Sequence, residues 1–305
     1  MHLSVIICTH NPRKDYLTRT LDALKAQTLP REQWELLLVD NASAEPLAGQ
    51  RDLSWHPGAR HIREETLGLT PARLRGIREA RAELLVFVDD DNVLAPDYLA
   101  VASAIGEQWP TLGAWSGSVI PEFETPPPAE LQPYLWCLCI RPVEKDNWSS
   151  FMDPKSCPWG AGMCVRATVA RRYSEKAGHN AQHALLGRRG KELGSAEDLD
   201  LATTSYESGL GTGLFAKLKL THLIPSSRLK LDYLLNLISD SAASHAIFTH
   251  LLGEKFLAPV SRIDRLVAFY KYLRATPLQR QVERAHQKGM AKARAILSDN
   301  KNEPR

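Results

Sequence analysis

Short apolar runs alternate with amphipathic segments in the first third of the chain. The continuous runs predict three buried β-strands, at residues 4–9, 35–39 and 83–88. Apolar residues at helical spacing predict a helix over residues 15–27. Thr70 and Pro71 are typical of an N-cap and a first-turn proline, and they predict a helix over 70–81. Strand–helix–strand alternation at this spacing indicates a parallel α/β sheet with right-handed crossovers.

The pattern changes after Pro225. Residues 214–220 still predict a strand, but the later segments have helical apolar spacing. They predict helices at residues 229–237, 246–252 and 263–273, followed by an amphipathic basic helix at 279–296. We therefore expect an α/β body at residues 1–225 and a C-terminal helical extension at 226–305.

The composition is that of a globular protein, with 44% hydrophobic and 24% charged residues, which argues against disorder. No apolar stretch approaches the length that spans a bilayer. The N-terminus enters a strand without the basic region or cleavage site of a signal peptide. The five cysteines lack a convincing zinc-ligand spacing, so we expect reduced thiols in a cytoplasmic protein.

Charge is distributed unevenly along the chain. Residues 255–305 hold 12 Lys and Arg against 4 Asp and Glu, a balance of +8, whereas residues 1–254 hold 26 against 31, a balance of −5. A basic tail on an acidic body favours attraction to an anionic surface, so peripheral contact with the inner face of a membrane is one expectation. Nucleic acid or an acidic partner would also fit the charge, and a merely solvated helical face is the more common explanation of such a run. The C-terminal part could instead cover the acceptor site, pack on the body or form a homodimer.

Carboxylates follow two of the predicted strands. Asp40 follows the second strand, and Asp89, Asp90 and Asp91 follow the third. Open α/β sheets bind ligands beyond the carboxyl ends of their strands, and three adjacent aspartates repel one another unless a positive charge lies between them. Mg²⁺ or Mn²⁺, which take oxygen ligands and bridge to phosphates, are the expected cations. A solvated acidic turn is the alternative that the aspartates alone leave open.

The turn after the first strand argues against one class of nucleotide site. Dinucleotide-binding domains need a glycine-rich turn there, and residues 8–13 contain no glycine. NAD or FAD is therefore not expected, and a mononucleotide held by side chains and a metal ion fits better.

Four motifs, in this order, resemble the nucleotide-sugar half of the family-2 glycosyltransferases, which have the GT-A fold. They are residues 4–11, 36–43, 68–73 and 86–92. The resemblance continues through residues 159–163, 197–201 and 221–222. It implies a Rossmann-like, mostly parallel central sheet flanked by helices, with the nucleotide-sugar half at 1–110 and the acceptor half at 111–225.

The resemblance assigns residues to the nucleotide. Asp40 is similar to the carboxylate that accepts a hydrogen bond from the nucleobase. The loop from Thr9 to Asn11 resembles the loop that forms the wall of the nucleobase pocket in the family, and Arg73 resembles a basic residue near the nucleotide. The family often has an asparagine where this chain has Leu74, which weakens any nucleotide contact inferred at that position.

The resemblance also implies a metal site. Asp89 and Asp91 are similar to the outer residues of an Asp-x-Asp motif, in which the first lies near the ribose and metal-bound water and the second ligates the cation. Asp90 is the middle residue and is expected to point differently, because strand side chains alternate between faces. His222 resembles the C-terminal histidine that completes the metal site, and imidazole is a suitable ligand for Mn²⁺.

Asp198 resembles the general base that removes the proton from the acceptor hydroxyl. The spacing from Ser195 to Asp198 is also typical of a capping box, and spacing alone favours the cap. The place of Glu197 and Asp198 in the motif order favours the base, and a helix N-terminus would keep the carboxylate ionised. Glu197 is then expected to bind the acceptor or fix the loop, and Asp200 to cap or solvate the helix.

Two glycines follow Trp159. Gly160 and Gly162 allow the backbone to approach a ligand closely, although a tight strand entry would also need them. The resemblance places this segment beside the sugar, with Trp159 as a stacking platform; a core tryptophan is the alternative.

Together these features predict a metal-dependent, inverting glycosyltransferase. It would move a sugar from a nucleoside-diphosphate sugar to a hydroxyl acceptor in glycan or glycolipid synthesis, with Mn²⁺ or Mg²⁺ neutralising the departing diphosphate. A lipid-linked acceptor is one expectation, and nucleic acid is not expected as a partner. The alternatives are a sugar-phosphate nucleotidyltransferase, which would need a glycine-rich basic loop at residues 9–13, and a noncatalytic nucleotide- or carbohydrate-binding protein.

Overall fold

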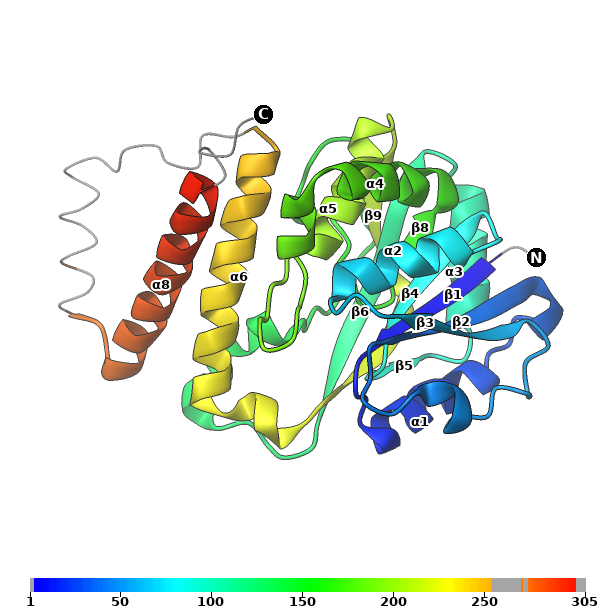
Figure 1. Ribbon diagram of the computed structural model, residues 1–305, viewed down its shortest axis with the longest axis horizontal. Coiled ribbons are helices and arrows are strands. Elements are labelled where there is room, and N and C mark those ends of the chain that lie inside the picture. Colours follow the sequence, from blue (N-terminus) through cyan, green and yellow to red (C-terminus); the bar gives the residue numbers. More distant parts are fainter. Residues whose placement is uncertain (1–2, 254–269, 271–273, 300–305) are drawn as a thin grey trace.

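The predicted strands belong to one nine-stranded sheet. The computed structural model describes residues 3–253, 270 and 274–299, and its strand order is β3-β2-β1-β4-β8-β6-β9-β5, with β7 paired to β9 (Figure 1). The strands are β1 (Leu3–Thr9), β2 (Trp34–Asn41), β3 (Ala59–Glu64), β4 (Leu84–Asp89), β5 (Asn92–Leu94), β6 (Leu112–Phe123), β7 (Asn147–Ser149), β8 (Cys164–Arg166) and β9 (Gly211–Ile224). The strands β1 to β4 are parallel, as the apolar runs predicted.

Helices cover both faces of the sheet. The α-helices of the described residues are α1 (Lys14–Lys25), α2 (Leu69–Glu79), α3 (Tyr98–Gln108), α4 (Ala167–His179), α5 (Glu197–Glu207), α6 (Leu231–Leu251) and α8 (Pro277–Asp299), and α1 to α5 are the ones on the faces of the sheet. One buried apolar cluster joins α1 and α3 to the sheet, and a second joins α2, α4 and α5 to it. The GT-A-type architecture with a C-terminal helical extension is confirmed.

The strand register brings the predicted site residues together. Because β1 lies between β2 and β4, Thr9 is opposite Asp40 on one side and Cys8 is opposite Asp89 on the other. The short strand β5 follows the three aspartates and pairs antiparallel with β9, which places Asn92 opposite His222. A residue more than a hundred positions away is thereby held next to the acidic cluster.

Within its described residues, the C-terminal extension contains the helices α6 and α8, which pack against each other beside the sheet (Figure 1). The two predicted helices at 229–237 and 246–252 are one continuous helix, because the residues between them include buried Ser239 and Ser244, which pack like the apolar positions. The prediction at 279–296 is confirmed as α8, whereas the prediction at 263–273 lies, apart from residue 270, outside the described residues. Among the described helices, none combines the length and apolar composition needed to cross a membrane.

Helix α2 begins one residue before its predicted N-cap. Its first residue is Leu69 and its N-cap is Gly68, whose φ of +143° is a conformation that L side chains rarely adopt. Two long-range contacts fix this start: the Gly68 N–H donates to the side chain of Asn41 at 2.8 Å, and the Leu69 N–H donates to the carbonyl of Arg188 at 2.8 Å. Tertiary hydrogen bonds therefore decide the boundary instead of Thr70.

Candidate active site

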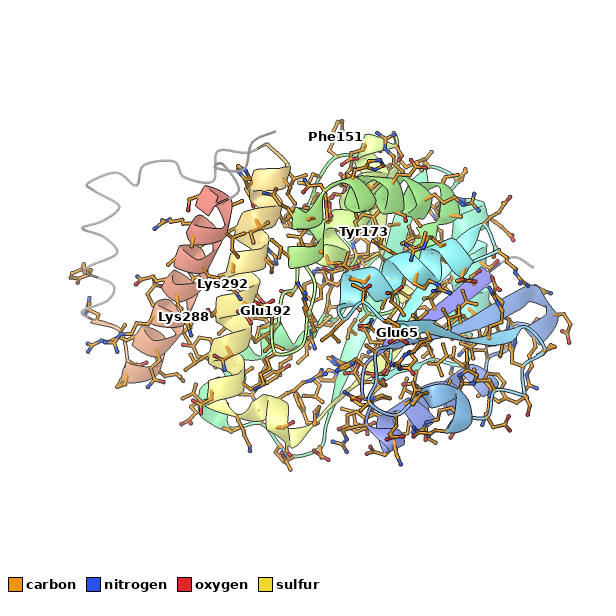
Figure 2. The ribbon with its side chains drawn as sticks, viewed as in Figure 1. Glu65, Phe151, Tyr173, Glu192, Lys288 and Lys292 are labelled. Atoms are coloured by element: carbon orange, nitrogen blue, oxygen red, sulfur yellow. The ribbon has the colours of Figure 1, made fainter. Side chains whose placement is uncertain are left out.

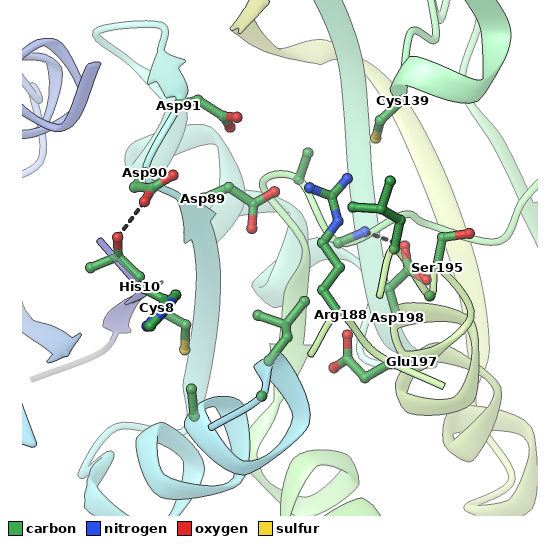
Figure 3. A pocket seen from close by; sticks show the side chains of 18 of the residues that line it. Cys8, His10, Asp89, Asp90, Asp91, Cys139, Arg188, Ser195, Glu197 and Asp198 are labelled. Carbon is green, nitrogen blue, oxygen red and sulfur yellow. Dashed lines mark hydrogen bonds between the residues drawn. The ribbon is translucent and has the colours of Figure 1, made fainter. Parts of the chain in front are cut away.

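A cavity of about 370 Å³ opens beyond the carboxyl ends of β1 and β4. Residues from distant parts of the sequence line it: Cys8, Thr9, His10, Asn41, Arg73, Asp89, Asp90, Asp91, Gly160, Arg188, Glu197, Asp198, His222 and Arg228. Figure 3 shows the three aspartates on one side and Glu197 and Asp198 on the other. The acidic motif and the predicted base therefore face one cavity.

Asp90 is the partly enclosed member of the acidic motif. The hydroxyl of Thr9 donates a hydrogen bond to its carboxylate. Burial, followed by the negative charge of Asp91, raises the pKa of Asp90 to about 7. Asp89 is also half-buried, with 39% of its side chain exposed, and it faces the cavity (Figure 3), whereas Asp91 is buried.

Asp91 contacts a guanidinium as well as the predicted histidine. Its Oδ2 lies 2.9 Å from Arg228 Nη2 and 3.5 Å from His222 Nε2, and Arg228 Nη1 donates to His222 Nε2 at 3.1 Å. Burial opposes ionisation of Asp91, but His222 and Arg228 outweigh it and hold the pKa of this carboxyl well below its usual range. Arg228 was not identified from the sequence; its only signal is a basic residue shortly after His222.

The donor chemistry of Asp91 and His222 suits a divalent cation. Carboxylate oxygen and imidazole nitrogen are both ligands for Mn²⁺, and His222 Nδ1 is buried without a hydrogen-bond partner among the described residues. In the part of the chain that the structure describes, however, no three His, Cys, Asp or Glu residues gather as a metal site. The protein thus offers two side-chain ligands, and Arg228 contacts both of them.

Arg73 is almost fully buried and pairs with Glu197. Its Nη1 donates to Glu197 Oε2 at 2.6 Å, and its Nη2 lies 3.6 Å from Asp89 Oδ1. A Cβ at Gly160 would lie 2.6 Å from Arg73 Nη2, so only glycine leaves room for this guanidinium. Burial raises the pKa of Glu197 to about 7, although Arg73 acts in the opposite direction.

Asp198 lies in the first turn of α5 without capping it. Its Oδ2 accepts a hydrogen bond of 2.8 Å from the Gly160 N–H, and its Oδ1 accepts one of 2.9 Å from the Leu199 N–H. The hydroxyl of Ser195 instead donates to Ser241 Oγ at 2.7 Å, and the N-cap residue of α5 is Ala196. The capping-box alternative is therefore wrong.

Asp200 also differs from its prediction. It is buried and contacts His183 Nδ1 and, at 3.0 Å, Lys176 Nζ. Its carboxylate ties α5 to α4 and the neighbouring turn; it neither caps the helix nor faces solvent.

Asp40 and Asn11 organise loops beside the cavity and are not among its lining residues. Both Asp40 oxygens accept hydrogen bonds, Oδ1 from the Ser43 N–H and Oδ2 from the Leu47 N–H and Arg63 Nη1, and these bonds outweigh burial and lower the pKa of Asp40. The Asn11 side chain accepts a bond from the backbone of Ala44. The contact of Asp40 and Asn11 with a nucleobase stays a prediction.

Trp159 and Gly162 are likewise occupied by other contacts. The guanidinium of Arg141 lies 3.4 Å from the centre of the Trp159 ring and covers one of its faces. Gly162 has a φ of +68°, and its carbonyl accepts a hydrogen bond of 2.6 Å from the Tyr98 hydroxyl. Of the predicted sugar-side segment, Gly160 lines the cavity, while Trp159 and Gly162 are not among the lining residues.

Arg188 is a second lining residue that the sequence did not single out. Its side chain points into the cavity toward Asp89 (Figure 3), and it makes no ion pair with any residue that the structure describes. It belongs to a short basic, glycine-containing stretch, residues 188–191, which was the only available signal.

Comparisons with known proteins agree with this geometry. Residues 4–112 match the model of Glycosyl transferase family 2. The chain is 21% identical over 239 residues to the glucosyl-dolichyl phosphate glucuronosyltransferase of Haloferax volcanii, covering 77% of this chain and 73% of that protein. It is 32% identical over 92 residues to the glycosyltransferase AglE of the same organism, covering 29% of this chain and 30% of AglE.

The fold is shared with solved structures of TarS from S. aureus. The TarS 1-349 crystal structure has a TM-score of 0.54 at 16% identity, covering 99% of this chain and 91% of that one. The complex of TarS 1-349 with UDP-GlcNAc gives the same TM-score of 0.54 at 15% identity, covering 99% of this chain and 92% of that one. The family resemblance is confirmed: the chain carries a family-2 glycosyltransferase segment on a GT-A fold, and it is a glycosyltransferase.

Proposed function

We propose that this glycosyltransferase uses a nucleoside-diphosphate sugar as donor and a hydroxyl compound as acceptor, and inverts the configuration of the transferred sugar. The observation that carries the proposal is the cavity in which Asp91, which contacts His222 and Arg228, lies opposite Asp198 (Figure 3). TarS, which shares the fold, has been solved with UDP and with UDP-GlcNAc, and this supports a nucleotide-sugar donor.

The side of the cavity with the acidic motif is the proposed diphosphate site. Asp91 and His222 would hold Mn²⁺ or Mg²⁺ together with the donor, and the cation would stabilise the negative charge that develops on the leaving diphosphate. Arg188 and Arg228 add guanidinium groups that suit phosphate oxygens. Asp89 faces Arg188 across the cavity and would add negative charge that attracts this guanidinium and the metal ion (Figure 3).

Asp198 is the proposed general base. The hydrogen bonds from the Gly160 and Leu199 N–H groups hold its carboxylate at the cavity. It would accept the proton of the acceptor hydroxyl as that oxygen attacks the sugar, and a single displacement of this kind inverts the anomeric configuration.

The nucleobase can be identified without knowledge of the acceptor. Thermal unfolding of the purified protein would be measured with a panel of nucleoside diphosphates, each with and without Mn²⁺. We expect one base to raise the melting temperature more than the others, and more strongly with Mn²⁺, because ligands that bind only the folded state stabilise it. No stabilisation by any nucleoside diphosphate under either condition would contradict the proposed donor site.

A lipid-linked acceptor and a cytoplasmic location at a membrane surface are part of the proposal. The name of the H. volcanii relative, a dolichyl phosphate glucuronosyltransferase, supports the first. The membrane location depends on the charged outer face of α8, because Ala293 and Leu297 on its other face are buried against α6. Flotation with anionic vesicles at low but not at high salt is the expected result; no flotation at low salt would leave packing within the protein or a homodimer as the role of this helix.

A further inference from the structure

One wall of the cavity is a loop, residues 186–196, that runs from α4 and its following turn to α5. Arg188 points from this loop into the cavity, and Leu193, Gly194 and Ser195 also line it. The loop leads directly into Asp198, the proposed base. Its position therefore affects both the proposed diphosphate site and the proposed base.

Backbone hydrogen bonds join the ends of the loop, from the Ala196 N–H to the Leu186 carbonyl at 3.1 Å, and join the Arg188 carbonyl to the start of α2. A small turn is closed by two hydrogen bonds, from the Arg189 N–H to the Glu192 carbonyl at 3.1 Å and from the Glu192 N–H to the Arg189 carbonyl at 2.9 Å. Gly190, with a φ of +57°, permits this turn. The rest of the loop depends on contacts with the helices beside it.

Helix α6 holds the second half of the loop through side chains. Asp240 Oδ2 accepts a hydrogen bond of 2.8 Å from the Leu193 N–H. Ser244 Oγ accepts one of 3.1 Å from the Ser195 N–H, and Ser241 Oγ accepts one of 2.7 Å from the Ser195 hydroxyl. These bonds satisfy backbone groups that would otherwise need water.

Helix α8 reaches the same loop through Lys292 (Figure 2). Lys292 Nζ lies 2.9 Å from Glu192 Oε1 on the loop and 3.3 Å from Asp240 Oδ1 on α6. Without the ammonium group, these two carboxylates would have no cation between them. Partial burial lowers the pKa of Lys292, but the hydrogen bond that Lys292 donates to Glu192 and the charge of Asp240 outweigh it and raise the pKa above its ordinary value.

The helices approach each other closely enough for this contact. A Cβ at Gly289 would lie 2.0 Å from the Ser239 carbonyl oxygen, so the backbones of α6 and α8 nearly touch there. Gly289 and Ala293 are buried, Lys292 contacts Glu192 on the loop, and Lys288 is exposed (Figure 2). The two lysines are thus one turn apart on the same helix, and only the second contacts the loop.

We infer that Lys292 is a positioning residue: through Glu192 and Asp240 it fixes the loop at residues 186–196 and thereby holds Arg188 in the donor cavity. This inference rests on the proposed function for the role of Arg188, but the loop contact itself does not. It gives the basic C-terminal helix a role in the active site that the charge pattern alone did not indicate.

The test compares three full-length variants, Lys292→Met, Lys292→Arg and Lys288→Met, with the wild-type protein. Amide hydrogen exchange of residues 186–196 would be measured first, because it needs no ligand. We expect Lys292→Met to accelerate exchange in this loop without affecting β1 and β4, Lys292→Arg to restore protection, and Lys288→Met to match the wild type. Unchanged exchange in Lys292→Met, or faster exchange spread over α6 and α8, would overturn the inference.

The second measurement is the affinity for the nucleoside diphosphate that binds the wild type best, with Mn²⁺ present. We expect Lys292→Met to weaken binding roughly fivefold, in the range of one partly exposed ion pair, and Lys292→Arg to recover it. Wild-type affinity in Lys292→Met despite a loosened loop would contradict a role in the donor cavity. If the wild type bound no nucleoside diphosphate, the proposed function would fail, while the exchange measurement would still decide the loop contact.

Discussion

The backbone N–H of Gly160 donates a hydrogen bond of 2.8 Å to Asp198 Oδ2. This bond joins two of the glycosyltransferase motifs that lie beyond the nucleotide half of the chain. Because the Leu199 N–H occupies the other oxygen at 2.9 Å, the orientation of the carboxylate is set by backbone groups instead of flexible side chains. A general base benefits from such fixed geometry, since proton transfer requires hydrogen-bond reach to the acceptor.

Replacing the proposed base tests this role. Asp198→Asn keeps the shape of the side chain but removes the basic oxygen, so we expect glycosyl transfer to fall by about 10²–10⁴-fold. Donor affinity should stay near that of the wild type, because the base acts on the acceptor. Release of nucleoside diphosphate from the donor and calorimetric binding would measure the two effects. Near-normal turnover in a folded variant would remove Asp198 from the mechanism.

Arg228 contacts both Asp91 and His222, and we expect it to contribute to diphosphate binding. Arg228→Gln removes a guanidinium from the proposed phosphate site, so metal-free affinity for the nucleoside diphosphate should fall about tenfold, in the range of a charge-assisted hydrogen bond. Lys230→Gln changes an exposed residue of the same segment and serves as the matched control. Equal affinities in the two variants, measured by calorimetry in the presence of EDTA, would contradict this role.

Gly160 leaves space for the buried guanidinium of Arg73. In Gly160→Ala the new methyl group would lie 2.6 Å from Arg73 Nη2, so we expect a loss of about 1–3 kcal/mol in the free energy of unfolding and weaker donor binding. Gly178→Ala in α4 is the control, because a Cβ there meets nothing within 4 Å and alanine is the better helix former. Chemical denaturation would compare the variants. Equal stability of Gly160→Ala and the wild type would show that Arg73 moves without cost.

Asp40 has a lowered pKa, so its contribution to stability depends on pH. A carboxyl whose pKa is lower in the folded than in the unfolded state stabilises the fold above its unfolded value of about 4, and this contribution is lost as the pH falls through the folded value. Asp40→Asn should therefore be less stable than the wild type at pH 7, and the difference should shrink below about pH 4. Denaturation midpoints at pH 7, 5 and 3 would show this. A difference that is constant with pH would mean that the ionised form of Asp40 contributes nothing.

The strands that carry the site could be predicted from the sequence because they are buried on both faces. The continuous apolar runs before Asp40 and Asp89 leave little alternative to a parallel sheet, and the order of the motifs then predicts which carboxylates meet. Strand β3 was missed for the opposite reason. Its sequence contains Arg60, His61 and Arg63 and lacks an apolar run. It forms a strand because its backbone pairs with β2, and the local sequence pattern does not reveal this pairing.

The positions of the missed site residues depend on long-range contacts. Arg188 and Arg228 lie in segments without regular apolar periodicity. Arg188 reaches the cavity from a loop that is hydrogen-bonded to α2 and α6, and Arg228 reaches it from the turn that follows β9. The spacing from Ser195 to Asp198 was misleading in the same way. The Ser195 hydroxyl bonds to Ser241 on α6, a partner 46 positions away, so the local capping pattern is not used.

The account depends most directly on a nucleoside diphosphate that binds together with a divalent cation at Asp91. The measurement is calorimetric titration of the preferred nucleoside diphosphate into the wild type and into Asp91→Asn, each with Mn²⁺ and with EDTA. We predict that Mn²⁺ greatly strengthens binding to the wild type but not to Asp91→Asn, which loses an anionic ligand and keeps its shape, while metal-free binding persists through Arg228. Equal nucleotide affinity in the two proteins under both conditions would contradict the account.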